Sequence, residues 1–194
     1  SPLVAFGKGF NKDLAGVFMD YIYTSRNRQI YRNFIENMKI FIPNISRITT
    51  NPEKGEIFIE EEEFGIPALL HQYGEGANKL FRILLQMTFQ KGGQILIDEI
   101  DSGIHFMRFP KFWETILKVA YLNDIQVFAT THNIECIHCF KTVLEQPQRF
   151  EKVILSEKFE AFAKASRVIT LYQSKENQPK ARTRSFSAFQ EAIN

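Results

Sequence analysis

The sequence predicts an α/β protein built on a parallel β-sheet, and three observations support this fold class. Strand and helix patterns alternate from residue 93 to residue 140, as in sheets with right-handed crossovers. The run QILIDEI (94–100) is apolar up to its acids, which is typical of a strand covered on both faces. Polar residues, Asp98, Glu99 and His132, follow two of these strands. Ligands bind beyond such strand ends, so we expect the functional site there.

The first part of the chain shows helical spacing followed by a hairpin. Residues 1–45 form a predicted helical segment, because apolar side chains recur every three or four residues from Leu14 to Met38. Residues 45–60 read as two strands joined by a turn at 51–55. The acids 60–63 are expected to form a solvated edge that blocks further strand pairing.

Residues 46–194 are predicted to form one lobe. A long helix starts at Gly74, a strand follows at 94–100, and a helix with Pro110 in its first turn comes next. A second buried strand lies in DIQVFATTHN (124–133), and IECIHCFKTVLEQ (134–146) is helical. A further strand is expected at 168–172, a mobile polar stretch in QSKENQPKARTR (173–184), and a closing helix in SFSAFQEAIN (185–194).

Composition limits the classes of protein that this chain can represent. Its 194 residues suit one domain, and 44% hydrophobic residues with 19 Phe provide a real core. A formal charge of +2 does not suggest a nucleic-acid coat. No run is long enough to span a bilayer, and residues 1–10 lack a signal-peptide layout. Two cysteines make no disulfide framework, so a cytoplasmic protein is expected.

The acids after the first buried strand are suited to phosphoryl-transfer chemistry. One carboxylate of Asp98 and Glu99 can hold Mg²⁺, which prefers oxygen ligands, and the other can deprotonate an attacking water. Successive strand residues point to opposite sides, which would separate the two roles. The structural alternative is that these acids cap the next helix or pair with Arg82 or Arg108.

Two further segments strengthen the hypothesis of a site at these strand ends. His132 could hydrogen-bond a phosphate oxygen or the attacking water, although a lone histidine is more often a satisfied core residue. The stretch YGEG (73–76) opens a helix with two glycines. Free backbone N–H groups at a helix start attract anions, but most such stretches are simple turns.

In this order and at this spacing, the motifs resemble the C-terminal half of an ABC-type ATPase head, which has a P-loop NTPase-like fold. The nearest branch is that of the AAA/OLD-like ATPases, related to SMC and DNA-repair ATPases. YGEGANKLFRILLQM resembles the signature helix, QILIDEIDSGIH the Walker B strand with its D-loop, and VFATTHN the switch-histidine segment. The resemblance covers about residues 40–194.

The resemblance implies a role for each candidate residue. Asp98 would hold the Mg²⁺ shell, Glu99 would be the general base, and His132 would sense the γ-phosphate of ATP. Asp101 and Ser102 would lie in the D-loop at the seam of a homodimer. Gly74, Glu75 and Gly76 would contact the γ-phosphate of ATP bound to the opposite subunit, so that two heads sandwich the nucleotide.

Two departures from the family pattern qualify this expectation. No serine precedes the glycines, because Tyr73 stands there, so contacts to the anion would come from backbone amides. No Gly-x-x-x-x-Gly-Lys-Ser/Thr loop occurs, and AFGKGF (5–10) lacks the earlier glycine and the following hydroxyl. We therefore expect the P-loop half to lie upstream in the same protein and this piece alone to be inactive.

Several alternatives stay open at the level of sequence. The chain could be a non-catalytic interaction module that retains the fold. Cys136 and Cys139, with His132 and His138, invite a zinc hypothesis, although one C-x-x-C supplies two thiolates where structural zinc takes four ligands. The family resembled includes phage-defence proteins with nuclease or effector partners. DNA binding has little support here, since the basic clusters at 26–32 and 180–184 suit a solvated helix face and a tail.

Overall fold

The computed structural model of the protein describes residues 3–4, 11–24, 28–63, 65–152, 154, 156–174, 178–185 and 188. The chain divides into two units, Ser1–Ile137 and His138–Asn194, and helix α5 crosses this boundary. The elements of the first unit are β1 (Leu3–Val4), α1 (Asn11–Phe18), the π-helix η2 (Met19–Tyr23), α2 (Arg28–Met38), β2 (Ile45–Asn51), β3 (Glu56–Glu61), β4 (Ala68–Leu69), the 3-10 helix η3 (Leu70–Tyr73), α3 (Gly74–Phe89), β5 (Gln94–Ile97), the 3-10 helix η4 (Phe106–Arg108), α4 (Phe109–Leu122), β6 (Gln126–Ala129) and the start of α5 (Ile134–Leu144).

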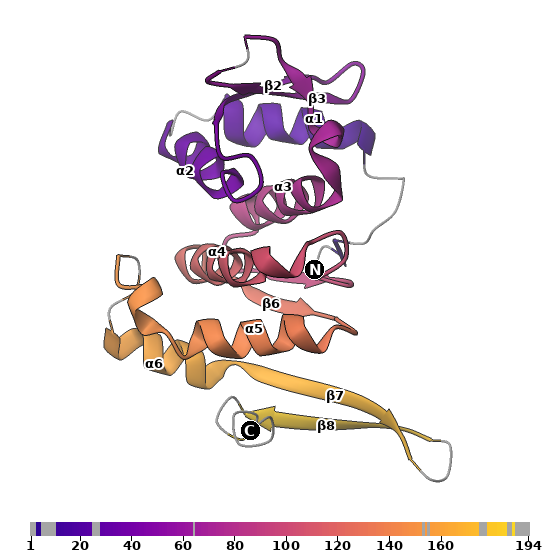
Figure 1. Ribbon diagram of the computed structural model, residues 1–194, viewed down its shortest axis with the longest axis vertical. Coiled ribbons are helices and arrows are strands. Elements are labelled where there is room, and N and C mark those ends of the chain that lie inside the picture. Colours follow the sequence, from indigo (N-terminus) through magenta and orange to yellow (C-terminus); the bar gives the residue numbers. More distant parts are fainter. Residues whose placement is uncertain are drawn as a thin grey trace. The chain divides into compact units, whose positions relative to one another are not determined.

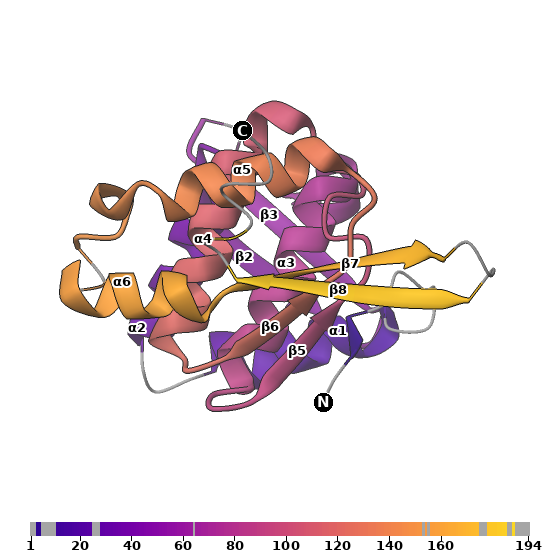
Figure 2. The same cartoon turned by 90° about the horizontal axis from the view of Figure 1, so that it is seen from below.

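A parallel sheet with the strand order β1-β5-β6 forms the base of the first unit. Strands β5 and β6 run side by side in Figure 2, with Ile97 paired to Ala129 at their ends. The predicted parallel sheet is therefore confirmed. Strand β1 corrects the expectation that residues 1–45 are a helical segment, because Leu3 and Val4 pair with β5 instead.

One face of this sheet is open within the described residues, which corrects the expectation of a strand covered on both faces. Ile95 and Ile97 are buried, but Leu96 and its register partner Phe128 are 36% and 44% exposed. Alternate strand residues point to opposite faces, so the buried isoleucines meet the core while this pair faces away. On the same outward face, Gln94 Nε2 donates to Gln126 Oε1 at 2.9 Å.

Helix α3 lies between the α1–α2 pair and α4 in the first unit (Figure 1). The spacing of its apolar residues predicts a buried stripe, and the stripe is confirmed, since Leu80, Phe81, Ile83, Leu84 and Met87 are at most 1% exposed. A helix buried along such a stripe gains most of its stability from packing. Because α3 is held in this way, the position of the YGEG stretch at its start is also determined.

The second sheet has the order β2-β3-β4 and is antiparallel. The predicted hairpin is confirmed, with Ile48 paired to Ile59 across β2 and β3. Strand β3 is not an edge strand, because Phe58 and Ile59 pair with β4. That pairing nevertheless stops at Ile59, before the acidic run begins.

An aromatic cluster joins α1, α2 and α3. The ring of Phe18 lies 5.3 Å from those of Phe34 and Phe81, and Phe34 and Phe81 are 5.1 Å apart. The two edge-to-face pairs, both made by Phe34, stabilise the fold beyond the burial of their area. The predicted helical segment is thus real from α1 to α2, although η2 interrupts it with a π-helical turn.

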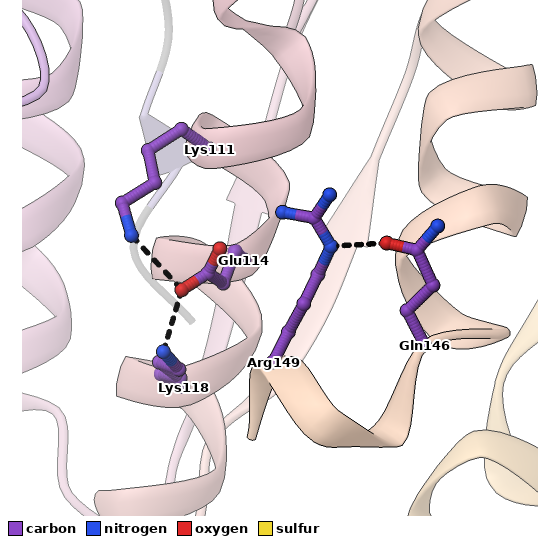
Figure 3. A network of polar contacts seen from close by, with 5 residues as sticks. All are labelled: Lys111, Glu114, Lys118, Gln146 and Arg149. Carbon is purple, nitrogen blue, oxygen red and sulfur yellow. Dashed lines mark hydrogen bonds and ion pairs between the residues drawn. The ribbon is translucent and has the colours of Figure 1, made fainter. Parts of the chain in front are cut away.

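The second unit contains the rest of α5, the 3-10 helix η5 (Pro147–Arg149), α6 (Ser156–Ala165) and the antiparallel strands β7 (Arg167–Gln173) and β8 (Pro179–Ser185). Phe150 and Phe159 stack at 4.7 Å in its core. Arg149 Nε donates to Gln146 Oε1, as Figure 3 shows. Strand β8 corrects the expectation of a mobile polar stretch. The predicted closing helix falls almost wholly outside the described residues.

Candidate active site

The carboxyl ends of β5 and β6 meet through Thr130, the residue that follows β6. Its backbone continues the strand pairing, since Thr130 N donates to Ile97 O and Ile100 N donates to Thr130 O, both at 2.9 Å. Its hydroxyl donates to Asp98 Oδ1 and accepts from Glu99 N at 2.9 Å. One threonine therefore fixes the carboxylate of Asp98 and the backbone of Glu99.

Strand β5 ends at Ile97, so both acids lie in the turn after it. The alternation of strand residues therefore does not decide which way each carboxylate points. Glu99 has φ of +45°, a left-handed conformation that is uncommon and costly for a residue other than glycine. Its carbonyl accepts from Ser102 N at 2.9 Å. Asp98 and Glu99 are exposed, so this turn presents two carboxylates to solvent from a fixed backbone.

Lys79 of α3 supplies the positive charge beneath the acids, and sequence reasoning missed it. It is 1% exposed, and its Nζ donates to Glu99 O and, at 3.4 Å, to Ser102 O. Burial lowers the pKa of Lys79 to about 8, although attraction to Asp101, Glu99 and Asp98 opposes that shift. The detectable signal was a lysine on the buried helix face of Leu80 and Ile83.

The VFATTHN segment also positions Asp101. Thr131 Oγ1 donates to Asp101 Oδ1 and accepts from Asn133 N at 3.0 Å. The hydroxyls of Thr130 and Thr131 thus hold two acids of the adjacent turn, a role that the sequence analysis assigned to no residue. Ser102 is half-buried in the same turn.

His132 is exposed and lies two residues beyond Thr130. Among the described residues, it makes no hydrogen bond or ion pair with Asp98 or Glu99. The acids therefore meet the end of β6 through Thr130, and the imidazole of His132 follows two residues later without a hydrogen bond to either acid. The role of His132 stays a prediction.

The YGEG helix start packs directly against the turn after Ser102. A Cβ at Gly76 would lie 2.6 Å from the Phe41 ring and 2.8 Å from Gly103 O. A Cβ at Gly103, whose φ is +74°, would lie 2.7 Å from the Cβ of Glu75. Only glycine allows this approach at both positions. Two segments far apart in the sequence therefore form one continuous surface.

The first turn of α3 offers backbone amides and no side-chain hydroxyl. Tyr73 occupies the N-cap without a capping hydrogen bond, and its hydroxyl donates to Glu61 Oε1 at 2.7 Å. Burial, then the bond to Glu61, raise the pKa of Tyr73 to about 12. Gly74 and Glu75 are exposed, although the Gly74 N–H already donates to His71 O at the end of η3. An anion could approach this helix start, where backbone amides are the only donors of the first turn.

The alternative that the acids after β5 form an ion pair with Arg108 receives no support. Arg108 donates to Ile40 O and lies 4.9 Å from the centre of the Phe41 ring. For Mg²⁺, the exposed carboxylate of Asp98 with the neighbouring Thr130 hydroxyl is a suitable oxygen donor set, since Mg²⁺ takes one or two carboxylates and completes its shell with phosphate and water.

The zinc hypothesis gains nothing from the geometry. No group of three or more His, Cys, Asp or Glu side chains is arranged to hold a metal ion in the part of the chain that the structure describes. Cys136 is buried and Cys139 half-buried, which fits small apolar residues of a helix. Cys136 O accepts from Trp113 Nε1 at 3.0 Å.

Residues 2–137 match the family model described as "AAA domain, putative AbiEii toxin, Type IV TA system". This match covers well over half of the chain. The chain belongs to this AAA family. The prediction of an ABC/AAA-type ATPase domain is thereby confirmed, together with its mixed α/β, P-loop NTPase-like fold.

Relatives of known sequence or structure agree with this assignment. The chain is 24% identical over 123 residues to an "ATP/GTP phosphatase" of Helicobacter pylori (strain ATCC 700392 / 26695), across 62% of the chain and 33% of that protein. It therefore spans about a third of the length of this curated relative.

Two solved structures show the same fold as this chain. One is the Smc head domain of Pyrococcus furiosus bound to the C-terminal domain of ScpA, with a TM-score of 0.54, 16% identity and coverage of 86% of this chain and 38% of that chain. The other is an SMC ATPase studied for ATP-driven dimerisation and DNA-stimulated activation, with a TM-score of 0.52, 17% identity and coverage of 92% and 94%. At these identities the likeness establishes the fold alone.

Proposed function

We propose that this chain forms the part of an ATP-hydrolysing ABC-type head that carries the catalytic acids. The observation that supports this most is the turn after β5, in which Asp98 and Glu99 are held exposed by Thr130 from one side and Lys79 from beneath. A strained, braced and charged turn of this kind is costly to fold. A role of the two carboxylates in acting on a ligand would explain why the protein keeps this costly turn.

Each residue has a chemically distinct task in this proposal. Asp98 would hold Mg²⁺, directly or through water, and the bound ion would neutralise charge on the β- and γ-phosphates. Glu99 would orient a water and accept its proton as it attacks the γ-phosphorus. His132, exposed at the end of β6, would donate a hydrogen bond to a γ-phosphate oxygen.

The helix start and the neighbouring turn would serve the second nucleotide of a homodimer. Because Gly76 and Gly103 bring α3 and residues 101–103 together, the amides of Gly74, Glu75 and Gly76 would lie on the same surface as Asp101 and Ser102. A γ-phosphate carried by the partner head would bind at this helix start, and the Gly74 N–H would exchange its bond to His71 O for one to the phosphate. Nucleotide binding would thereby join two heads.

The remaining half of the nucleotide site is expected outside this sequence. The sequence contains no P-loop motif, and β6 is an edge strand of its sheet within the described residues. An unpaired parallel edge beside the catalytic acids suits a further strand, which we assign to an upstream P-loop half of the same protein. The piece alone would then bind ATP poorly.

The cellular setting is proposed from the relatives rather than from the site. The neighbours by structure are SMC heads, one of them bound to ScpA and one stimulated by DNA, so a protein or nuclease partner and a DNA-linked role are reasonable for the whole protein. The OLD-like resemblance suggests phage defence in the cytoplasm. No helix among the described residues is long and apolar enough to cross a membrane.

The test is ATP turnover by the intact protein that contains this chain, measured as phosphate release with Mg²⁺. Glu99→Gln should lower kcat by about a hundredfold or more while ATP still binds, since general-base loss acts on the chemical step. The matched control is Glu53→Gln, an exposed acid of the turn between β2 and β3. Unchanged turnover in Glu99→Gln would refute the assignment.

The 194-residue chain by itself provides a second arm of this test. It should release phosphate at a negligible rate. Mg²⁺-dependent turnover by this piece, abolished by Glu99→Gln, would show that no upstream half is needed and would leave the role of Glu99 intact.

A further inference from the structure

A second cluster of polar residues lies outside the candidate active site. It lines a pocket of about 430 Å³ formed by η2, α2 and the start of β2. A volume of this order suits a small organic ligand. Its lining residues are Tyr23, Arg28, Tyr31, Arg32, Ser46 and Arg47. None of them belongs to the turn after β5, to α3 or to the end of β6.

Three arginines from two elements line this pocket. Arg28 and Arg32 come from α2, and neither makes a hydrogen bond or ion pair with any residue that the structure describes. Arg47 NH2 donates to the Tyr23 hydroxyl at 3.1 Å. Gathering like charges costs free energy, so an anionic ligand would stabilise this arrangement.

One acid, Glu60, faces the cluster from the neighbouring strand. It stands opposite Arg47 in the β2–β3 register, and no ion pair joins the two within the described chain. Its charge contributes to a raised pKa of Arg47, after the hydrogen bond to Tyr23. One carboxylate against three arginines leaves the pocket with an excess of positive charge.

Two tyrosine rings, set nearly at right angles to each other, line the pocket beside the arginines. Tyr31 is held in place, because its hydroxyl accepts from Ile48 N at 2.9 Å and donates to Ile48 O at 3.2 Å. Tyr23 meets it edge-to-face at 5.9 Å and is 39% exposed. A nucleobase can stack on an aromatic ring that solvent reaches, and Tyr23 is such a ring.

We propose that this pocket binds a phosphorylated nucleoside, with the phosphate held by Arg28, Arg32 and Arg47 and the base against Tyr23. Planar guanidinium groups bind phosphate in paired hydrogen bonds. The nucleoside phosphate could be a free nucleotide or a unit of a single strand. The site is separate from the proposed ATPase site and does not depend on it.

The experiment titrates the 194-residue chain against two probes. One is a fluorescein-labelled, 5′-phosphorylated oligo(dT) of about ten nucleotides, followed by anisotropy. The other is 5′-AMP, added as a competitor of the oligonucleotide and also measured alone by calorimetry, with inorganic phosphate as a further competitor. Ultraviolet cross-linking and then peptide mapping identify the residue that touches the base.

The decisive variant is Arg32→Gln with Arg47→Gln, and its matched control is Arg182→Gln with Arg184→Gln on β8. Arg32→Gln with Arg47→Gln should weaken oligonucleotide binding by about tenfold or more. It should also reduce the slope of log K against log salt concentration by about 1.4. The control pair should leave the affinity within about twofold. Cross-links should map to Tyr23 or Tyr31.

Each outcome decides the proposal. If the oligonucleotide binds and 5′-AMP displaces it, the ligand is a unit of a single strand. If 5′-AMP binds and the oligonucleotide does not, the ligand is a free nucleotide. In either case the Arg32→Gln, Arg47→Gln variant must lose the binding. The proposal is overturned by binding of neither probe at millimolar concentration, by equal losses in both variant pairs, or by phosphate competing as well as 5′-AMP. Loss of binding in Glu99→Gln would also overturn it, because the ligand would then occupy the ATPase site.

Discussion

Lys79 is a charged side chain at a depth where charge is costly. It is 1% exposed, and burial lowers its pKa to about 8 from 10.5. Its Nζ donates to the backbone carbonyls of Glu99 and Ser102 in the turn that carries the acids. The side chain therefore fixes the shape of the turn while leaving Asp98 and Glu99 accessible to a ligand.

Replacing Lys79 by Met should change how stability depends on pH. A lysine with a lowered folded-state pKa destabilises the fold below that pKa, and the penalty is relieved as pH rises from about 8 towards 10.5. Between pH 7 and pH 10, the wild-type chain should gain about 2 kcal/mol relative to Lys79→Met. Urea denaturation at several pH values measures this, and a constant difference would contradict the assigned pKa.

Gly103 tests the contact between the helix start and the acidic turn. Gly103→Ala combines a strained φ of +74° with a Cβ 2.7 Å from Glu75 Cβ. Gly92→Ala is the matched control, because its φ is +71° but nothing lies within 4 Å. The control should cost about 1 kcal/mol of unfolding free energy from backbone strain alone, and Gly103→Ala about 2 to 3. Equal losses would mean that the close approach is relaxed in solution.

Helix α4 shows how a single element handles a buried acid. Glu114 is 5% exposed and its Oε1 accepts from Lys111 at 3.0 Å and Lys118 at 2.6 Å, one turn away on either side (Figure 3). Burial alone would raise the pKa of Glu114, but the two hydrogen bonds and lysine charges lower it overall. Helix α4 thereby provides both positively charged partners of its buried carboxylate.

Glu114→Gln should lower stability at neutral pH and do so less in acid. The depressed pKa means that the wild-type carboxylate stabilises the fold above its ordinary value of 4.5 and loses that contribution as pH falls through the lowered value. We expect a loss of about 1 to 3 kcal/mol at pH 7 that shrinks towards pH 3. Thermal or urea unfolding across this range measures it, and a loss independent of pH would point to packing instead.

At the scale of elements, the sequence predicts structure that local periodicity determines and misses structure that depends on distant parts of the chain. The helices from Gly74, Pro110 and Ile134 and the hairpin at 45–61 are predictable from spacing and turn residues. Strand β1 could not be found, because two residues carry no period and their partner lies about ninety residues away. Strand β8 reads as a polar loop, since PKARTRS has little apolar content and gains its order from pairing with β7.

The same distinction holds for the site. Asp98, Glu99, Asp101 and the glycines stand out because their residue types are expensive or special at those positions. Lys79 and Thr130 act through contacts to segments 20 and 31 residues away in the sequence, which residue type alone does not reveal. The sequence therefore points to the candidate site residues and not to the residues that hold them in place.

At the scale of the whole molecule, the first unit brings three separated segments to one region. Residues 74–76, 98–103 and 130–131 are joined by the Gly76–Gly103 approach and by the bonds of Thr130 and Thr131. The AAA family match spans this unit, residues 2–137. A nucleotide-driven association of two heads would act on all three segments together, because they cannot move independently without breaking those contacts.

Hydrogen exchange of the intact protein, measured by mass spectrometry, tests this arrangement most directly. In the Glu99→Gln background with Mg²⁺, ATP should slow exchange at residues 74–76 and at 98–103 together, and ADP should have a much smaller effect. If ATP binds while neither segment gains protection, or only one does, the two do not face a shared nucleotide.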